Sequence, residues 1–145
     1  MDCSPSYMYQ LQGNPPNPVT EQALANGWYV AAPDGESFNA SFGNGVQGCQ
    51  ATLDNIRAAL SSTVITGIAS DAAYAIAGYS GSSIAGEFAL ELQPTYAPEL
   101  NIAGAALGGL TPDARETLSN CNASPGSGLG KTSLHTAAHR DTFVE

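Results

Sequence analysis

The chain has 145 residues, a formal net charge of −9 at pH 7 and a sequence isoelectric point near 4.3. This acidic balance disfavours nucleic acid and anionic membrane surfaces as partners, because both repel a negatively charged protein. The sequence has no run of 18 apolar residues, so it predicts no transmembrane segment. The length allows one domain, and a charged content of only 12% suits a secreted protein.

The first predicted elements are a strand and a helix. Residues 28–32 form an apolar run that ends at the turn Pro33-Asp34-Gly35-Glu36. Asp-Gly is a common turn dipeptide, so the residues alone predict a turn at this point and nothing more. Residues 50–61 read as a helix, with apolar side chains at helical spacing at Leu53, Ile56 and Leu60.

Residues 72–92 hold the most informative pattern of the chain. Residues 72–77 are a short apolar run and predict a strand, and the tight turn Gly78-Tyr79-Ser80-Gly81-Ser82 follows at once. A helix is predicted next, because one face is apolar at Ile84, Ala85, Phe88, Ala89 and Leu92. Pro94 is expected to end that helix.

Strand, tight turn and helix in this order are typical of the nucleophile elbow, whose pattern is G-x-S-x-G. Ser80 takes the nucleophile position and Tyr79 the variable position before it. Strand and helix pass close beside the serine, so Gly78 and Ser82 are expected to be small. Ser82 stands where the pattern has its final glycine, which is a departure from it.

Residues 102–107 predict a further buried strand, closed by Gly108-Gly109. Strands that alternate with helices indicate an α/β fold with a parallel sheet and right-handed crossovers. In such sheets the functional site gathers at the carboxyl ends of the strands. Ser80 follows one strand and Asp34 another, so we expect the two residues to be neighbours in space.

Four stretches of the chain carry a family resemblance. AGYSGSSIA at residues 77–85 and ELQPTYAPELNIAGAALGGLTP at residues 91–112 resemble the fungal secretory lipases of the Candida lipase A type. DCSPSY at residues 2–7 and ANGWYV at residues 25–30 look like the same family. The resemblance runs from about residue 2 to Pro112.

The resemblance implies a partial α/β-hydrolase fold with a nucleophile elbow and the hydrolysis of triacylglycerols or other esters at a lipid interface. It implies an extracellular enzyme without cofactor or metal. Ser80 is then the nucleophile, and the backbone N–H groups of Gly81 and Asp34 form the oxyanion hole. The family usually has a bulky residue where Gly35 stands and glycine where Ser37 stands.

In this family the triad acid and histidine lie far downstream of the serine. We therefore expect residues 1–112 to be a partial α/β-hydrolase core and residues 113–145 a divergent, poorly ordered tail. The start Met1-Asp2-Cys3-Ser4-Pro5 has neither the basic nor the apolar region of a signal peptide. The chain is thus expected to be truncated at both ends and to be inactive, because no triad acid or histidine of the family is present.

The tail contains other candidate catalytic, phosphate-binding and metal-binding residues, and their sequence context disfavours each of them. His135 or His139, with Asp113 or Asp141, satisfies the chain order of a triad, but a Ser/Gly/Pro-rich tail supplies no rigid loop beside Ser80. Residues 125–132 resemble a phosphate-binding loop without a preceding strand. The two histidines have metal-ligand spacing but no obvious third ligand.

Two points stay open from the residues. Spacing does not decide whether Cys3 and Cys49 form a disulfide, and Cys121 is expected to be a free thiol. The alternative function is a non-catalytic remnant or binding protein of the same fold. Such a protein is expected to be soluble and cooperatively folded, whereas exposed sheet edges of an incomplete hydrolase invite aggregation.

Overall fold

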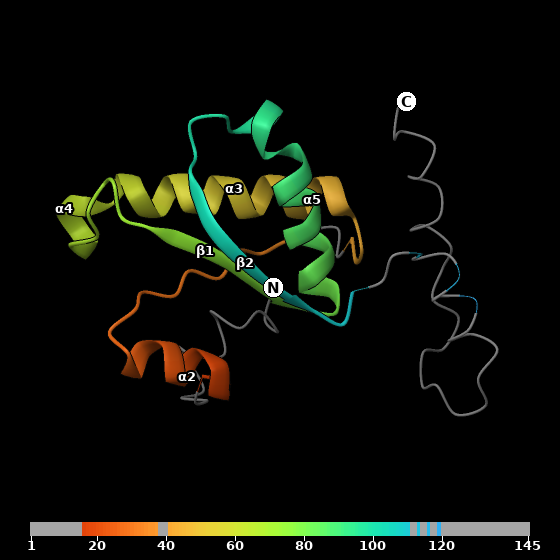
Figure 1. The fold of residues 1–145 in the computed structure, drawn as a ribbon, viewed down its shortest axis with the longest axis horizontal. Helices are drawn as coiled ribbons and strands as arrows, with labels where there is room; N and C mark the ends of the chain where they lie inside the picture. The colour runs from red at the N-terminus through yellow and green to blue at the C-terminus, as the bar shows by residue number, and fades with distance from the viewer. Residues whose placement is uncertain (1–15, 38–40, 111–112, 114–115, 117–118, 120–145) are drawn as a thin grey trace.

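The computed structural model describes residues 16–37, 41–110, 113, 116 and 119. Its helices and strands are, in chain order, α2 (Pro18–Ala25), α3 (Gly45–Ser61), α4 (Thr63–Thr66), β1 (Tyr74–Tyr79), α5 (Gly81–Tyr96) and β2 (Ile102–Gly108) (Figure 1). The predicted boundary at residue 112 and both histidines lie outside the described residues, so the division into core and tail stays a prediction. Within the described part, no helix combines the length and apolarity needed to cross a membrane.

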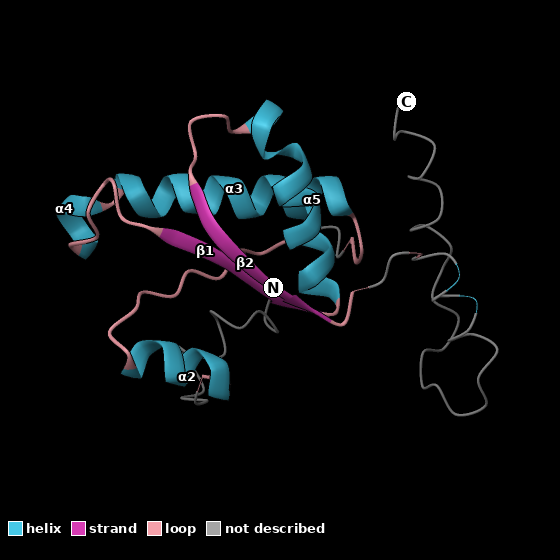
Figure 2. Cartoon of the chain, in the orientation of Figure 1, coloured by secondary structure: helices cyan, strands magenta, loops and turns pink. Residues whose placement is uncertain are grey.

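The centre of the fold is a strand-helix-strand unit. β1 and β2 pair in parallel, and α5 connects them (Figure 2). Ile76 pairs with Ala105, and Tyr79 pairs with Gly108 at the carboxyl ends of both strands. The predicted strand at residues 102–107 and the parallel pairing are confirmed. The helices and this two-stranded sheet are compatible with a partial α/β fold.

The core lies where the two long helices and the sheet meet. α5 packs against both strands and crosses α3 (Figure 1). Cys49 and Leu53 of α3 are fully buried there, and Ile76 of β1 and Ala89 of α5 are buried beside them. Cys49 is a free thiol whose pKa is raised, first by burial and then by the nearby Asp54 carboxylate. Cys3 and Cys121 lie outside the described residues.

α3 begins at Gly45, five residues before the predicted start of this helix. Asn44 caps it, because its side-chain oxygen accepts a hydrogen bond from the Gln47 N–H at 3.1 Å. Glycine normally weakens a helix. Here, however, a methyl group built on Gly45 would overlap the Phe88 ring, and one built on Gly48 would lie 2.8 Å from Cβ of Ala85. The close approach of α5 therefore requires glycine at two positions where helix propensity disfavours it.

The predicted strand at residues 28–32 is wrong. These residues are exposed and join neither β1 nor β2. A strand is stable only when a neighbour pairs with its backbone groups, and apolar composition alone does not supply that neighbour. Hydrogen bonds hold the start of the segment: the Trp28 N–H donates to the Ala23 carbonyl oxygen at 3.1 Å, and the Tyr29 hydroxyl donates to the Thr66 carbonyl oxygen at 3.2 Å.

Pro94 does not end the helix as predicted, since α5 continues to Tyr96. Proline removes the N–H that would donate to the carbonyl oxygen of Leu90, and its ring crowds that carbonyl, so a helix continues past it only when other contacts hold the segment. The Gln93 side chain supplies such contacts. Its amide group donates to the carbonyl oxygens of Ala97 at 2.9 Å and Leu100 at 2.8 Å, which satisfies two acceptors beyond the end of the helix.

The strands are less buried than expected from their apolar sequences. In β1, Ile76 is buried beneath the helices, whereas Ala75, Ala77 and Tyr79 are exposed. In β2, residues 103–106 are all exposed. α5 packs against one face of the sheet, so alternate residues of β1 meet solvent on the other face. In β2, four consecutive residues are exposed, so both faces of that strand meet solvent along residues 103–106.

A cluster of charged and aromatic groups joins α3 to the end of α5. Arg57 forms ion pairs with Asp54 at 2.8 Å and Glu99 at 2.6 Å, and it donates to the Tyr96 carbonyl oxygen at 2.9 Å. Its guanidinium also lies over the Tyr96 ring, 5.1 Å from the centroid. The hydrogen bonds from Arg57 lower the pKa values of both carboxyl groups. Arg57 thus connects two segments that are 42 residues apart.

This cluster predicts a specific loss of stability in acid. The two carboxyl groups have folded pKa values below their unfolded values of about 4, so their contribution is present above pH 4 and is lost as the pH falls further. Arg57→Met is expected to lower the melting temperature by only a few degrees at pH 7, because exposed ion pairs are individually weak. The difference from wild type should shrink between pH 5 and pH 3 in thermal unfolding followed by circular dichroism. An unchanged difference in acid would contradict this role, and Arg57→Lys serves as the charge-preserving control.

Candidate active site

Ser80 occupies the junction between β1 and α5 at the carboxyl end of the strand. Its backbone has φ 55° and ψ −120°, which is rarely adopted by residues other than glycine. Such a conformation costs about 1–3 kcal/mol and persists only when the surrounding structure enforces it. The Ser80 N–H donates to the Gly108 carbonyl oxygen at 2.9 Å, so the end of β2 holds the strained residue in place.

The Ser80 side chain is not used to cap the helix that it precedes. A serine at this position normally accepts a hydrogen bond from an N–H of the first helical turn. Here α5 has no side-chain cap bond, and Ser80 is exposed. The strained backbone therefore presents the hydroxyl to solvent and leaves it available for chemistry.

Gly78 and Ser82, the small residues two positions before and after Ser80, differ in how closely their surroundings restrict side-chain size. A methyl group built on Gly78 would lie 2.5 Å from the Ser82 carbonyl oxygen and 2.7 Å from its carbon, both backbone atoms. Gly78 is therefore required by the close passage of α5 over β1. Ser82 is itself exposed, so its side chain points away from this contact. The departure from the final glycine of the pattern is thus accommodated without a clash.

Two glycines of β2 and its following turn complete the surroundings of Ser80. Gly109 has φ 60°, and a methyl group built on it would lie 3.3 Å from the Ser80 nitrogen. The same methyl group would lie 3.1 Å from Cζ of Tyr79. Gly108 and Gly109 therefore allow the end of β2 to run directly beside the serine.

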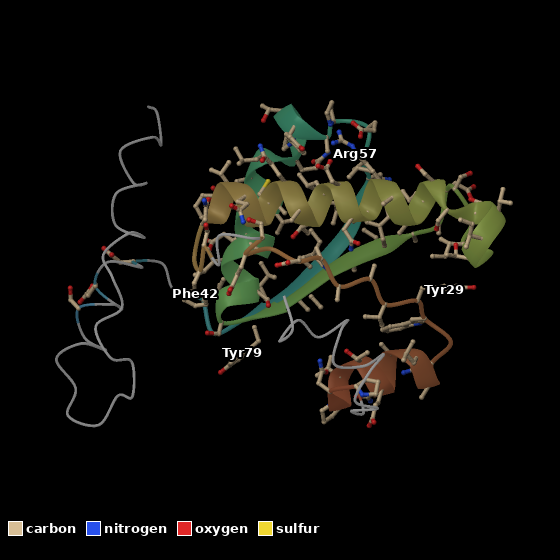
Figure 3. The ribbon with its side chains drawn as sticks, turned by 180° about the vertical axis from the view of Figure 1, so that it is seen from behind. Tyr29, Phe42, Arg57 and Tyr79 are labelled. Carbon is tan, nitrogen blue, oxygen red and sulfur yellow. The ribbon has the colours of Figure 1, made fainter. Side chains whose placement is uncertain are left out.

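The N–H of Gly81 begins the first turn of α5, where backbone donors have no partner inside the helix. Among the described residues it has no hydrogen-bond acceptor. The Phe42 ring lies against Gly81. A methyl group built on this glycine would be 2.9 Å from Cε2 of Phe42. Figure 3 shows Phe42 and Tyr79 at the same end of the sheet, away from Tyr29 and Arg57.

The Asp34 turn lies beside the first turns of α3. The Gln47 side chain donates to the Gly35 carbonyl oxygen at 3.0 Å, and a methyl group built on Gly35 would lie 3.7 Å from Cα of Gly48. The turn is also linked to the Phe42 loop, since the Ser41 N–H donates to the Glu36 carbonyl oxygen at 3.0 Å. These contacts connect the turn to the segment that touches Gly81.

Asp34 itself stabilises the turn through its side chain. Its Oδ1 accepts hydrogen bonds from the N–H groups of Glu36 at 3.2 Å and Ser37 at 3.1 Å. The side chain is thus occupied, whereas the Asp34 N–H has no acceptor among the described residues. The turn dipeptide expected from the residues is present. Within it, the N–H groups of Asp34 and Gly35 both lack an acceptor among the described residues, and Asp34 is the residue for which the resemblance implies an oxyanion role.

Ser37 ends this turn with φ 53°, in the left-handed region that favours glycine. This explains in physical terms why glycine suits the position. Ser37→Gly is expected to raise the free energy of unfolding by about 0.5–1 kcal/mol, the relief of left-handed strain less the entropy that glycine loses. This change in the free energy of unfolding is measured by urea unfolding. Ser82→Gly, at an ordinary helical position, should instead be neutral or lower stability by about 0.5 kcal/mol; equal effects of both changes would disprove the explanation.

The described residues contain no histidine, since both histidines of the sequence, His135 and His139, fall outside them. The same holds for Asp141, whereas Asp113 is described and its carboxylate accepts a hydrogen bond from the Glu116 N–H at 2.9 Å. The geometry around Ser80 thus consists of a strained serine, free backbone donors and aromatic neighbours.

A family model described as secretory lipase matches residues 17–143. The chain belongs to the secretory lipase family. The matched range includes β1, the Ser80 turn, α5 and β2. It also extends beyond Pro112, the last residue of the motifs that resemble the family, so the similarity reaches further along the chain than those motifs indicate.

The curated relatives are fungal lipases. Lipase 2 of Candida albicans is 48% identical over 119 residues, which cover 75% of this chain and 25% of the relative. Lipase A of Arthroderma benhamiae is 43% identical over 133 residues, which cover 84% of this chain and 28% of the relative. Lipase 1 of Candida albicans is 42% identical over 149 aligned residues, which cover 96% of this chain and 32% of the relative. The chain therefore spans about a quarter to a third of the length of these relatives. No solved structure matches it.

Sequence reasoning missed several neighbours of Ser80. Phe42 stands alone in a polar and glycine-rich loop, and no periodicity marks it as a contact of Gly81. Gly109 reads as an ordinary strand end. Ser83 reads as a small helical residue, although it is fully buried and its hydroxyl donates to the Ser80 carbonyl oxygen. The spacing of three residues between Ser80 and Ser83 is the one sequence feature from which this contact could have been inferred.

Proposed function

We propose that this chain carries the nucleophile and oxyanion hole of a serine lipase or carboxylic ester hydrolase with an α/β-hydrolase fold. The observation that carries the proposal is Ser80: an exposed, non-capping serine in a strained backbone conformation between a parallel strand and a helix. Membership of the secretory lipase family supports it, as do the relatives named lipases. The family also supports an extracellular location.

In the proposed reaction, the Ser80 hydroxyl attacks the carbonyl carbon of a triacylglycerol or other ester at a lipid interface. The alcohol leaves, and an acyl-enzyme forms that water then hydrolyses. The N–H groups of Gly81 and Asp34 stabilise the negative charge on the carbonyl oxygen, with each donor worth about 3–4 kcal/mol in the transition state. Both N–H groups lack an acceptor within the described residues, as this role requires.

Ser80 needs a general base that removes its proton, normally a histidine oriented by an acid. No histidine is found among the described residues. The two histidines of the chain, His135 and His139, stand in a Ser/Gly/Pro-rich tail that is not expected to place either of them rigidly beside Ser80. We therefore propose that a polypeptide consisting of these 145 residues alone turns over esters negligibly. The segment would act when joined to the rest of a full-length family member, in which the resemblance places the triad acid and histidine downstream of the serine.

A chimera tests the proposal. The matching segment of Lipase 2 from Candida albicans is replaced by this chain's residues, and hydrolysis of p-nitrophenyl butyrate is measured. We expect the chimera to hydrolyse the ester and the isolated chain not to. A chimera that folds but stays inactive beside an active parent lipase would contradict the proposal and favour the alternative, a non-catalytic binding protein of the same fold.

A further inference from the structure

The carbonyl oxygen of Ser80 is held more firmly than a helix start requires. The Ser83 N–H donates to it at 2.9 Å and the Ile84 N–H at 3.3 Å, as expected at the beginning of a helix. The Ser83 hydroxyl adds a third and shorter hydrogen bond, with 2.6 Å between Oγ and the carbonyl oxygen. One residue thus donates twice to the same acceptor.

Ser83 is placed so that its hydroxyl serves this carbonyl. It is 0% exposed, in contrast to its exposed neighbour Ser82. A buried hydroxyl costs free energy unless it is hydrogen-bonded. The donor is directed at the Ser80 carbonyl oxygen, so burial makes this hydrogen bond strong and keeps the side chain in one orientation.

The peptide unit between Ser80 and Gly81 transmits this restraint. The carbonyl group of Ser80 and the N–H of Gly81 belong to one planar unit, in which they point in opposite directions. Fixing the direction of the carbonyl therefore fixes the direction of the N–H. At Ser80 this matters more than elsewhere, because ψ −120° accompanies a positive φ and the chain would otherwise relax away from it.

We propose that Ser83 is a positioning residue that fixes the Gly81 N–H through the planar peptide between Ser80 and Gly81. The proposal rests on the proposed function in one respect, that the Gly81 N–H stabilises the oxyanion. Ser83 touches no substrate and acts only through the peptide unit. Ser83 contributes by holding the Gly81 N–H in a direction that does not have to change during the reaction.

The experiment compares Ser83→Ala and Ser83→Cys with Ser82→Ala in the 145-residue chain by nuclear magnetic resonance. Ser83→Cys nearly keeps the side-chain volume while weakening the donor, so a packing defect is separated from the lost hydrogen bond. We expect both Ser83 variants to shift the Ser80 carbonyl carbon and Gly81 amide resonances by more than Ser82→Ala does, although Ser82 is the direct neighbour of Gly81 in the chain. Ser83 variants that lower the melting temperature but shift both resonances no more than Ser82→Ala does would overturn the proposal.

A kinetic arm uses the chimera with Lipase 2. Loss of the Ser83 donor is expected to lower kcat about tenfold with KM nearly unchanged, less than the loss of an oxyanion donor itself. A shifted Gly81 resonance with unchanged kcat would overturn the catalytic part of the inference. If Ser80→Ala leaves hydrolysis intact, the proposed function fails, whereas the resonance arm still decides whether Ser83 fixes the peptide.

Discussion

Ser80→Ala in the chimera is expected to lower kcat for p-nitrophenyl butyrate by about 10⁴-fold or more, because it removes the nucleophile that forms the acyl-enzyme. Alanine has the same backbone constraints as serine at positive φ, so the strain at this position and the stability of the fold should change little. Steady-state kinetics and thermal unfolding of the same preparation separate the two effects.

Ser82→Ala is the matched control for this substitution. Ser82 is also an exposed serine of the same turn, two residues further along. It makes no contact that the proposed reaction uses, so its variant should keep kcat within about twofold of the unsubstituted chimera. Substantial residual activity in Ser80→Ala, or an equal loss in both variants, would contradict the assignment of Ser80.

Gly78→Ala is expected to lower the free energy of unfolding of the isolated chain by about 2–3 kcal/mol, the upper part of the range for overpacking. The added methyl group would lie 2.5 Å from the carbonyl oxygen of Ser82, which is a backbone atom of α5 and has no alternative rotamer. Strand and helix would have to separate at the point where they hold Ser80. Urea unfolding followed by circular dichroism measures the loss.

Gly86→Ala provides the comparison on the same helix. A methyl group there would lie 2.7 Å from Cδ2 of Leu107, which is the far end of a side chain and is able to move, and at the more tolerable distance of 3.2 Å from Cγ2 of Ile76. Replacing glycine by alanine inside a helix also gains about 1 kcal/mol in propensity. The net change should stay within about 1 kcal/mol of wild type. If Gly78→Ala costs no more than Gly86→Ala, the close passage of α5 over β1 is not what requires glycine at residue 78.

The predictions for Ser80→Ala and Gly78→Ala concern one arrangement. The backbone strain at Ser80 destabilises the fold, and the contacts around Ser80 offset this loss. The strained conformation costs about 1–3 kcal/mol. It is maintained by the hydrogen bond from the Ser80 N–H to Gly108 and by the donors that converge on the Ser80 carbonyl oxygen. Gly78 and Gly109 provide the space that this arrangement needs. The result is a hydroxyl that is exposed although it sits between two packed elements.

The strand-turn-helix unit was predictable because its local signals agree. Residues 72–77 are apolar, the turn is rich in glycine and serine, and the following residues have helical periodicity. The parallel partner at residues 102–107 follows from the same alternation of elements. Ser80 stands out within this unit, since the pattern places it at the end of a strand, and its positive φ agrees with the elbow interpretation.

The remaining elements depend on contacts that no local signal reveals. Helix α3 includes Gly45 and Gly48 because α5 packs closely against them, whereas propensity alone starts the helix later. Residues 28–32 have the composition of a strand but pair with neither described strand. Phe42 reaches Gly81 across a loop, and neither spacing nor composition indicates such a contact. For α3 and Phe42 tertiary packing decides the outcome, and for residues 28–32 the lack of a pairing strand among the described residues decides it.

The most direct test of the nucleophile assignment is covalent labelling. The chimera with Lipase 2 is treated with a fluorophosphonate, which reacts with activated serines, and the modified residue is located by tandem mass spectrometry of its peptides. The proposed function predicts a single adduct on Ser80, abolished by Ser80→Ala and retained in Ser82→Ala. An adduct on a different serine, or an active chimera without any adduct on Ser80, would contradict it.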